Sequence, residues 1–165
     1  LNLDKIDDQS NGYFVEKWTN LTDAGETASN TADGGVNTDY PLFRLADVYL
    51  MIAEAFVRGG SGTTATEVVG YINPIQERAY GDDSNNKNAS QINLSFILDE
   101  RARELYWEGH RRTDLIRYGV FTTNGYLWQW KGGVKEGTAV NSRYNIYPIP
   151  TTELTANPNL YNENY

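Results

Sequence analysis

Apolar residues recur with a helical period across the middle of the chain. A favourable N-cap at Asp39 and a proline at Pro41, which suits a first helical turn, precede the first apolar stripe. The glycine pair Gly59-Gly60 marks its end. The pattern therefore predicts a helix between Pro41 and Gly59, with these residues along its apolar side: Leu42, Leu45, Val48, Tyr49, Ile52, Ala53 and Phe56.

A second stripe predicts a helix from about Thr63 to Tyr80, antiparallel to the first. Pro74 lies inside this helix, where it removes a backbone donor and crowds the preceding turn, so we expect a kink or a break near Asn73. Together the two helices span roughly forty residues, close to a tetratricopeptide hairpin. The expected buried residues of the second helix are Ala65, Val68, Val69, Ile72, Ile75 and Ala79.

The third periodic segment, residues 97–119, carries both an apolar stripe and regularly spaced charges. Asn93 or Ser95 provides its N-cap after the polar loop 81–90, and Gly109 predicts a break. The charges fall within one helical turn of each other, which predicts local ion pairs. The expected pairs join Asp99 and Glu100 to Arg103, Arg101 to Glu104, and Glu108 to Arg111 and Arg112.

The flanking regions lack this period. Residues 13–18 alternate in a way that predicts a strand, and residues 19–38 are a polar loop rich in Thr, Asn and Gly. After residue 119, glycines predict turns and a hairpin. The last segment contains Pro148, Pro150 and Pro158, which favour an extended strap anchored by Leu154, Leu160 and Tyr165.

Three motifs stand in order along the chain: FRLADVYLMIAEA at 43–55, the charged segment, and YPIPTTELTANPNL at 147–160. Together they resemble the SusD/RagB family of glycan-binding outer-membrane lipoproteins, whose charged signature reads ERxxELxxEGxRxxDLxRxG. The signature positions of this chain are Glu100, Arg101, Glu104, Leu105, Glu108, Gly109, Arg111, Asp114, Leu115, Arg117 and Gly119.

The resemblance implies a fold and an organisation. The expected fold is mainly α, with tetratricopeptide-like helical hairpins, long irregular loops and an extended C-terminal strap. We expect residues 1–165 to be a single C-terminal portion of a longer family member. Its parts would be a strand and polar loop (1–38), a helical core (39–119), and loops with a hairpin and the strap (120–165).

The resemblance also implies a function. The expected protein is not an enzyme but a carbohydrate-binding component of an outer-membrane glycan uptake system. It would capture an oligosaccharide or polysaccharide, such as the α-glucan starch, for a TonB-dependent, SusC-like transporter at the cell surface. The chain contains no cysteine to carry a lipid anchor, so we expect contact with the membrane only through an anchor upstream.

The composition of the chain limits the classes of molecule that it is expected to bind. A net charge of −8 argues against nucleic acid and anionic lipid, which basic surfaces usually bind. Aromatic residues make up 13% of the chain, which suits stacking on sugars as well as filling a core. The absence of cysteine removes thiol nucleophiles and thiolate metal sites, and no cofactor motif occurs.

The segment YLWQWKGG holds the candidate ligand-binding residues. Tyr126, Trp128 and Trp130 alternate, so an extended backbone would place them on one face, about 6.5 to 7 Å apart. Lys131 could then donate hydrogen bonds to sugar hydroxyls. The alternative is that these aromatic residues pack onto the helices, as large apolar side chains usually do.

Catalysis is the weaker alternative. Glu104 and Glu108, one helical turn apart, could form the carboxyl pair of a glycan hydrolase, but neighbouring arginines would keep them ionised. His110 is the only histidine, so we expect no metal site there, and the acidic loop at Asp82-Asp83 lacks EF-hand spacing. A further alternative is a pure scaffold or transporter-interface portion, with the sugar site upstream.

Overall fold

The computed structural model describes residues 3–8, 10–13, 15–22, 24–29, 35–162 and 165. These residues are mainly helical and form no strand beyond an isolated bridge between Leu21 and Thr27, which confirms the expected mainly α fold. The chain divides into two compact units. We call residues 14–111 the helical unit, and residues 1–13 with 112–165 the loop-rich unit.

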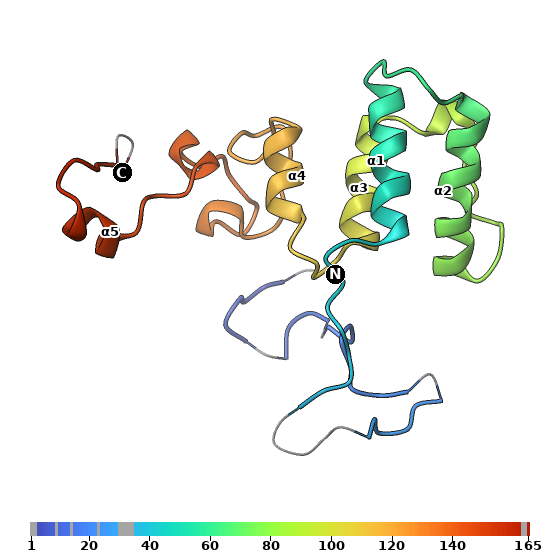
Figure 1. Ribbon diagram of the computed structural model, residues 1–165, viewed down its shortest axis with the longest axis horizontal. Helices are drawn as coiled ribbons and strands as arrows, with labels where there is room; N and C mark the ends of the chain where they lie inside the picture. Colours follow the sequence, from blue (N-terminus) through green and yellow to red (C-terminus); the bar gives the residue numbers. More distant parts are fainter. Residues whose placement is uncertain (1–2, 9, 14, 23, 30–34, 163–164) are drawn as a thin grey trace. The chain divides into compact units, whose positions relative to one another are not determined.

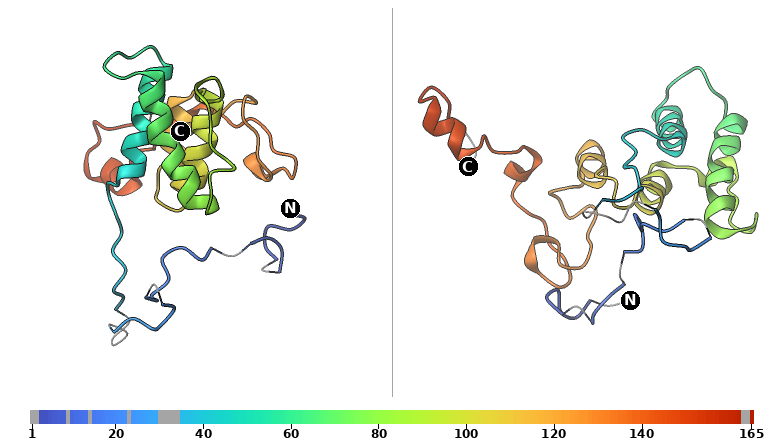
Figure 2. Two further views of the ribbon diagram at one scale, coloured as in Figure 1. Left: turned by 90° about the vertical axis from the view of Figure 1, so that its right-hand side faces the viewer. Right: turned by 60° about the horizontal axis from the view of Figure 1, so that its bottom comes forward.

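The helical unit is built on three helices, α1 (Leu45–Val57), α2 (Ala65–Tyr80) and α3 (Leu94–Glu104), with the short 3-10 helix η2 (Ala89–Gln91) before α3. In Figure 1, α1 and α2 run side by side in opposite directions, joined by the loop 58–64, and α3 lies beside α1. The views in Figure 2 show the same arrangement. The buried core comprises Ala46, Leu50, Ala53, Val68, Ile72, Ile75, Ile92, Ile97 and Leu105.

Helix α1 begins later than predicted and buries a different side. Its first residue is Leu45, and the N-cap is Arg44, whose extended backbone (φ −148°, ψ 156°) has no side-chain cap. Leu50 is fully buried, whereas Leu42, Leu45 and Val48 of the predicted stripe are exposed. Apolar residues lie on several sides of this helix, so the packing of α2 and α3 against it, not periodicity, selects the buried side.

The end of α1 follows the prediction closely. Gly59 adopts φ 93°, a left-handed conformation that glycine reaches without strain. Its N–H donates to the Phe56 carbonyl (2.9 Å), and the Gly60 N–H donates to the Ala55 carbonyl (2.8 Å). These two bonds form a Schellman motif, which satisfies carbonyls left open at the helix end.

Helix α2 runs through Pro74 without a break. Its N-terminus has a capping box, in which Thr64 accepts from the Glu67 N–H and Glu67 accepts from the Thr64 N–H (2.7 Å). Asn73, next to the proline, holds the loop that follows, since its side chain exchanges two hydrogen bonds with the backbone of Lys87. Of the predicted buried residues, Ala79 is exposed and Gln76 is buried in its place.

The charged segment breaks near Gly109, as predicted, but helix α3 already ends at Glu104. Asn93 is the N-cap and accepts from the Phe96 N–H (3.0 Å). The left-handed backbone of Trp107 (φ 60°) and Gly109 (φ 78°) separates α3 from α4 (Arg111–Arg117).

The loop-rich unit contains most of α4, two short 3-10 helices, η3 (Lys131–Gly133) and η4 (Ser142–Asn145), and helix α5 (Thr151–Ala156). The predicted extended strap therefore includes a short helix. Its N-cap is Pro150 (φ −55°, ψ 143°), and its first residue is Thr151. The anchor of this segment is Asn162, which accepts from the Ile149 N–H (2.7 Å) and donates to its carbonyl (3.1 Å). None of the described helices is both long and apolar enough to cross a bilayer.

Two predicted extended segments are not formed. In the predicted strand 13–18, residue 14 lies outside the described residues, and Lys17 and Trp18 lie in a turn in which Trp18 has φ 70°. In the predicted hairpin around YLWQWKGG, Trp130 has φ 68° and begins a turn. The described residues of both segments carry no strand pairing, and the left-handed residue near the end of each interrupts the extended backbone.

Candidate functional site

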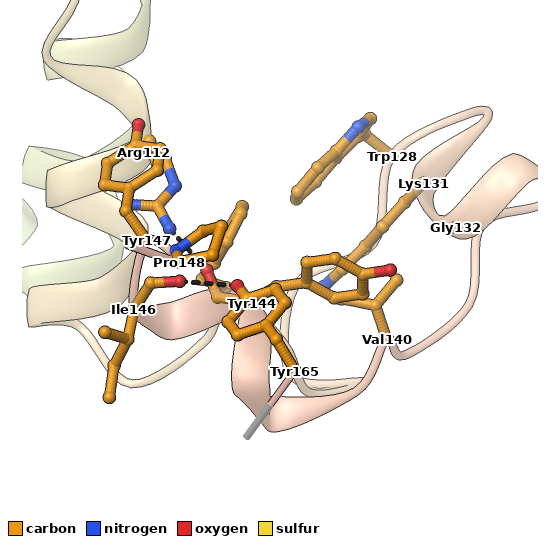
Figure 3. A pocket seen from close by; sticks show the side chains of 11 residues that line it. Arg112, Trp128, Lys131, Gly132, Val140, Tyr144, Ile146, Tyr147, Pro148 and Tyr165 are labelled. Atoms are coloured by element: carbon orange, nitrogen blue, oxygen red, sulfur yellow. Dashed lines mark hydrogen bonds between the residues drawn. The ribbon is translucent and has the colours of Figure 1, made fainter. Parts of the chain in front are cut away.

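An open cavity of about 450 Å³ lies in the loop-rich unit (Figure 3). It is formed where the start of α4, the loop around Trp128 and the segment from residue 140 onward meet the C-terminal residue. Most of its lining is aromatic or aliphatic. The lining residues are Arg112, Phe121, Trp128, Lys131, Gly132, Val140, Tyr144, Ile146, Tyr147, Pro148 and Tyr165.

Lys131 is the internal anchor of this region. Its side chain is almost fully buried, and its ammonium donates to the carbonyls of Val120 (3.2 Å), Thr123 (2.6 Å) and Tyr126 (2.8 Å). An ammonium has three N–H donors, so all of them are used. Burial lowers the pKa of Lys131. The side chain thus braces the loop, whereas the sequence suggested a donor to ligand hydroxyls.

The three alternating aromatic residues do not share a face. Trp128 lines the cavity, and the Lys131 ammonium lies 4.7 Å from its ring centre. The Tyr126 and Trp128 rings lie 6.4 Å apart with a tilt of 52°. Trp130 instead donates from Nε1 to the Leu3 carbonyl (2.9 Å), which secures the N-terminal segment. Of the predicted aromatic set, the cavity therefore includes Trp128.

The opposite side of the cavity was not predicted from the sequence. In Figure 3, Arg112 and Tyr147 face Trp128 across the opening. The Arg112 guanidinium lies 3.8 Å from the Tyr147 ring centre and 5.2 Å from that of Phe121, and donates to the Tyr144 carbonyl. The clustering of Tyr144, Tyr147 and Pro148 in sequence was the available signal, but the proline-rich motif favoured a purely structural interpretation.

Tyr165 closes the cavity at the C-terminus. Its hydroxyl donates to the Arg143 carbonyl (3.0 Å) or the Ile146 carbonyl (2.7 Å), and its ring meets that of Tyr144 edge to face, with centroids 6.4 Å apart. The predicted anchoring role of Tyr165 is thus seen in its contacts. The three rings at this end remain partly accessible: Tyr144 is 42%, Tyr165 45% and Tyr147 74% exposed.

The glutamates of the charged segment lie in the helical unit and form a network of ion pairs, which we call the ion cluster: Lys17, Arg44, Arg78, Glu104 and Glu108. Arg44 donates from Nε to Glu108 Oε2 (2.7 Å) and also pairs with Glu104, while Arg78 donates to Glu104 Oε2 (2.5 Å) and Lys17 pairs with Glu108. Both carboxylates are nearly inaccessible. The predicted local partners of Glu104 and Glu108 were therefore wrong.

The ion cluster fixes the protonation of its two carboxylates. Burial alone would raise the pKa of Glu104, but the hydrogen bonds from Arg78 and Arg44 outweigh it, and the pKa lies below the ordinary value. Burial likewise opposes Arg44 and Lys17 at Glu108, whose pKa is also lowered. A general acid in a glycosidase needs the opposite shift, so this pair is suited to structure rather than catalysis.

The other signature residues also make internal contacts. Arg103 donates to Glu100 (2.7 Å), as predicted, whereas Arg101 pairs with Asp47 of α1 (2.7 Å). Further contacts join Arg111 to the Leu98 carbonyl (2.9 Å) and Arg117 to Asp114 (2.9 Å).

Metal-binding side chains do not gather among the described residues, where no group of three His, Cys, Asp or Glu could hold an ion. In the acidic loop, Asp82 accepts from the N–H (3.0 Å) and the hydroxyl (2.5 Å) of Ser84, which closes a local turn.

Comparison with known proteins identifies the family of this chain. The model of the SusD family matches residues 4–165. The chain belongs to the SusD family. The starch-binding protein SusD of Bacteroides thetaiotaomicron is 42% identical over 166 aligned residues, which cover 100% of this chain and 28% of that protein. The motif-based resemblance is thereby confirmed.

Two further relatives support the assignment to the SusD family. SusD-like protein P25 of Formosa agariphila is 35% identical, over 88% of this chain and 26% of its own length. A crystal structure of a SusD superfamily protein from Bacteroides vulgatus superposes with a TM-score of 0.59 at 31% identity, over 82% of this chain and 30% of that one. The chain thus spans less than a third of the length of these relatives.

Proposed function

We propose that this chain is part of a non-catalytic protein that captures oligosaccharides, and that the cavity between Trp128 and Tyr147 contacts the sugar. The observation that carries the proposal is this cavity, lined by partly exposed aromatic rings, in a chain whose relative of 42% identity is named for binding starch. Starch or another α-glucan is accordingly the first ligand to test.

The geometry supports stacking. At about 450 Å³, the cavity falls within the range of small-molecule sites. The C–H face of a sugar ring buries apolar area against an aromatic ring, and Trp128, 38% exposed, offers such a ring opposite Tyr147. In this proposal Trp128 contacts the ligand, Tyr126 and Trp130 shape the loop around it, and Lys131 holds the loop in place.

Family membership supports the wider assignment. We infer that the chain is the C-terminal portion of a longer, surface-exposed lipoprotein of the outer membrane, anchored through lipid attached elsewhere. Its partner would be a TonB-dependent, SusC-like transporter that receives the glycan. The coverage of less than a third of each relative leaves room for the anchor and for further ligand contacts outside this chain.

The second candidate is a scaffold or transporter-interface role, with the sugar bound elsewhere in the longer protein. The observation in its favour is that the start and outer side of α1 expose apolar residues, including Phe43 (87%) and Leu45 (62%). Such a face suits packing against another helical segment. The hydrolase alternative has no comparable support, because the pKa values of Glu104 and Glu108 are lowered.

Calorimetric titration of the chain with starch oligosaccharides and a panel of other soluble glycans tests the proposal. Trp128→Ala should abolish binding. Tyr161→Ala provides the matched control, because Tyr161 is a 73% exposed aromatic residue of the same unit that does not line the cavity. Equal affinity of Trp128→Ala and the unmodified chain would favour the scaffold role.

A further inference from the structure

The loop-rich unit offers a charged group to its ligand as well as aromatic rings. We propose that the cavity, which also accepts neutral sugars, prefers sugars that carry a carboxylate, that is, uronic acid residues, and that Arg112 is the residue that determines this preference. The inference rests on the proposed function, because it names the class of glycan that the same cavity would bind most tightly.

Arg112 has hydrogen-bond donors available for a carboxylate ligand. A guanidinium has five N–H donors in one plane, and a single one of them is used, toward the Tyr144 carbonyl. The guanidinium stacks on the Tyr147 ring, 3.8 Å from its centre, and the Phe121 ring centre lies 5.2 Å away. The stack therefore fixes the plane of the guanidinium, while four N–H groups are without a hydrogen-bond partner among the described residues at the wall of the cavity.

The charges around the cavity agree with an anionic ligand. The lining residues include no Asp or Glu side chain, whereas Arg112 and Lys131 are both among them. Arg143 lies nearby, with its guanidinium 5.1 Å from the Tyr144 ring centre and 5.3 Å from that of Tyr165. The charged side chains that line the cavity are thus all cationic, which suits an anion placed beside Arg112.

The net charge of −8 does not oppose this assignment, because the two units share it unequally. The helical unit contains eight Lys and Arg residues and fifteen Asp and Glu residues, a net charge of −7. The loop-rich unit contains six and seven, a net charge of −1. At physiological salt the screening length is about 8 Å, so the groups that line the cavity dominate its local potential.

A carboxylate uses the free donors better than a neutral hydroxyl does. Its two oxygens can accept a pair of parallel N–H bonds from one guanidinium, which a hydroxyl oxygen cannot do, and charged hydrogen bonds are roughly twice as strong as neutral ones. Since the cavity is open to solvent, we expect about tenfold tighter binding of the acidic sugar, the equivalent of about 1.4 kcal/mol.

The test compares two ligands that differ in charge alone: an α-1,4-linked oligogalacturonide and the same oligosaccharide with its carboxyls reduced to alcohols. Calorimetric titration of the full chain at neutral pH should show about tenfold preference for the acidic form, declining as salt is added. Arg112→Met should remove the preference but keep binding of the reduced form. Arg143→Met, which removes a nearby cation that does not line the cavity, should keep the preference.

Arg112→Lys separates charge from geometry, because lysine keeps the charge but not the bidentate fork. It should retain less than half of the preference on a logarithmic scale. Circular dichroism confirms that each variant is folded, and the ratio of the two affinities in the unmodified chain decides the point even if a variant fails to fold.

Equal affinity for the acidic and reduced forms would overturn the inference and leave the proposed function standing. Loss of the preference in Arg143→Met to the same extent as in Arg112→Met would also overturn it, because the effect would then be general attraction. If neither form nor any neutral glycan bound, the proposed function itself would fail.

Discussion

The two units of this chain are stabilised in different ways. The helical unit buries a continuous set of aliphatic residues, among them Leu50 and Ile72 with no exposed surface. In the loop-rich unit, by contrast, single polar side chains hold the backbone: Lys131 spans three carbonyls, and Asn162 binds both polar groups of Ile149. The first unit depends on packed volume, and the second on a few hydrogen bonds.

This difference explains why the candidate site lies where it does. Within the helical hairpin, Tyr49 of α1 stacks on Tyr71 of α2 with ring centres 5.0 Å apart, so these rings pack the two helices together. In the loop-rich unit, hydrogen bonds from the side chains of Lys131 and Asn162 hold the backbone in place. Rings such as Trp128 and Tyr147 therefore remain partly exposed. A region held by backbone anchors can therefore present aromatic surface without losing its shape.

The largest expected effect is in the helical core. Leu50→Ala should lower the free energy of unfolding by about 3 kcal/mol, through lost burial and the cavity that remains. Met51→Ala, one position along the same helix but 46% exposed, is the control and should cost well under half as much. Urea unfolding followed by circular dichroism measures both. Similar losses would mean that packing does not distinguish the two sides of α1.

A smaller and more local effect is expected for the loop anchor. Lys131→Met keeps most of the side-chain volume but leaves three carbonyls without their donor, which should cost about 2 kcal/mol. Hydrogen exchange should accelerate across residues 120–138 and remain unchanged in α1 and α2.

The matched control for this anchor is Lys135→Met. Lys135 is 42% exposed and pairs with the exposed Asp4, so its loss should change exchange little. Equal acceleration in both variants would contradict the anchoring role of Lys131.

The smallest expected effect is a dependence on acid, specific to the helical unit. The folded pKa values of Glu104 and Glu108 lie below the ordinary 4.5, so their stabilising contribution is complete above that pH. As the pH falls below 4.5 through the folded pKa values, both carboxylates take up protons and the contribution is lost.

Urea unfolding at several pH values between neutral and about 3 tests this dependence, since carboxylates titrate over that range. Glu104→Gln, which stays neutral throughout, should be less stable at neutral pH and should show a shallower decline with acid. An unchanged slope in Glu104→Gln would show that the ion cluster does not cause the acid sensitivity.

The sequence predicted well those features that depend on neighbours along the chain. Helix α2, the glycine end of α1 and the break near Gly109 all follow from periodicity and local backbone preferences. The start of α1 did not: its N-cap is Arg44, whose side chain pairs with Glu104 and Glu108, sixty or more residues away. Local spacing cannot reveal such a partner.

The candidate site was only partly predictable for the same reason. Alternation correctly directed attention to Trp128, but the shared aromatic face required an extended backbone, and the left-handed turn at Trp130 prevents it. Arg112 and Tyr147 reach the cavity from a separate part of the chain. Their meeting depends on tertiary contacts that no window of sequence contains.

The positions of the tryptophans have a practical consequence. All four lie outside the helices, none is fully buried, and Trp18, Trp107 and Trp130 sit in left-handed turns. Intrinsic fluorescence therefore reports on turns and on the cavity, through Trp128, rather than on the packed hairpin. A change in tryptophan emission without a change in helical circular dichroism would therefore indicate that the loops unfold while the core stays folded, or that a ligand binds against the Trp128 ring.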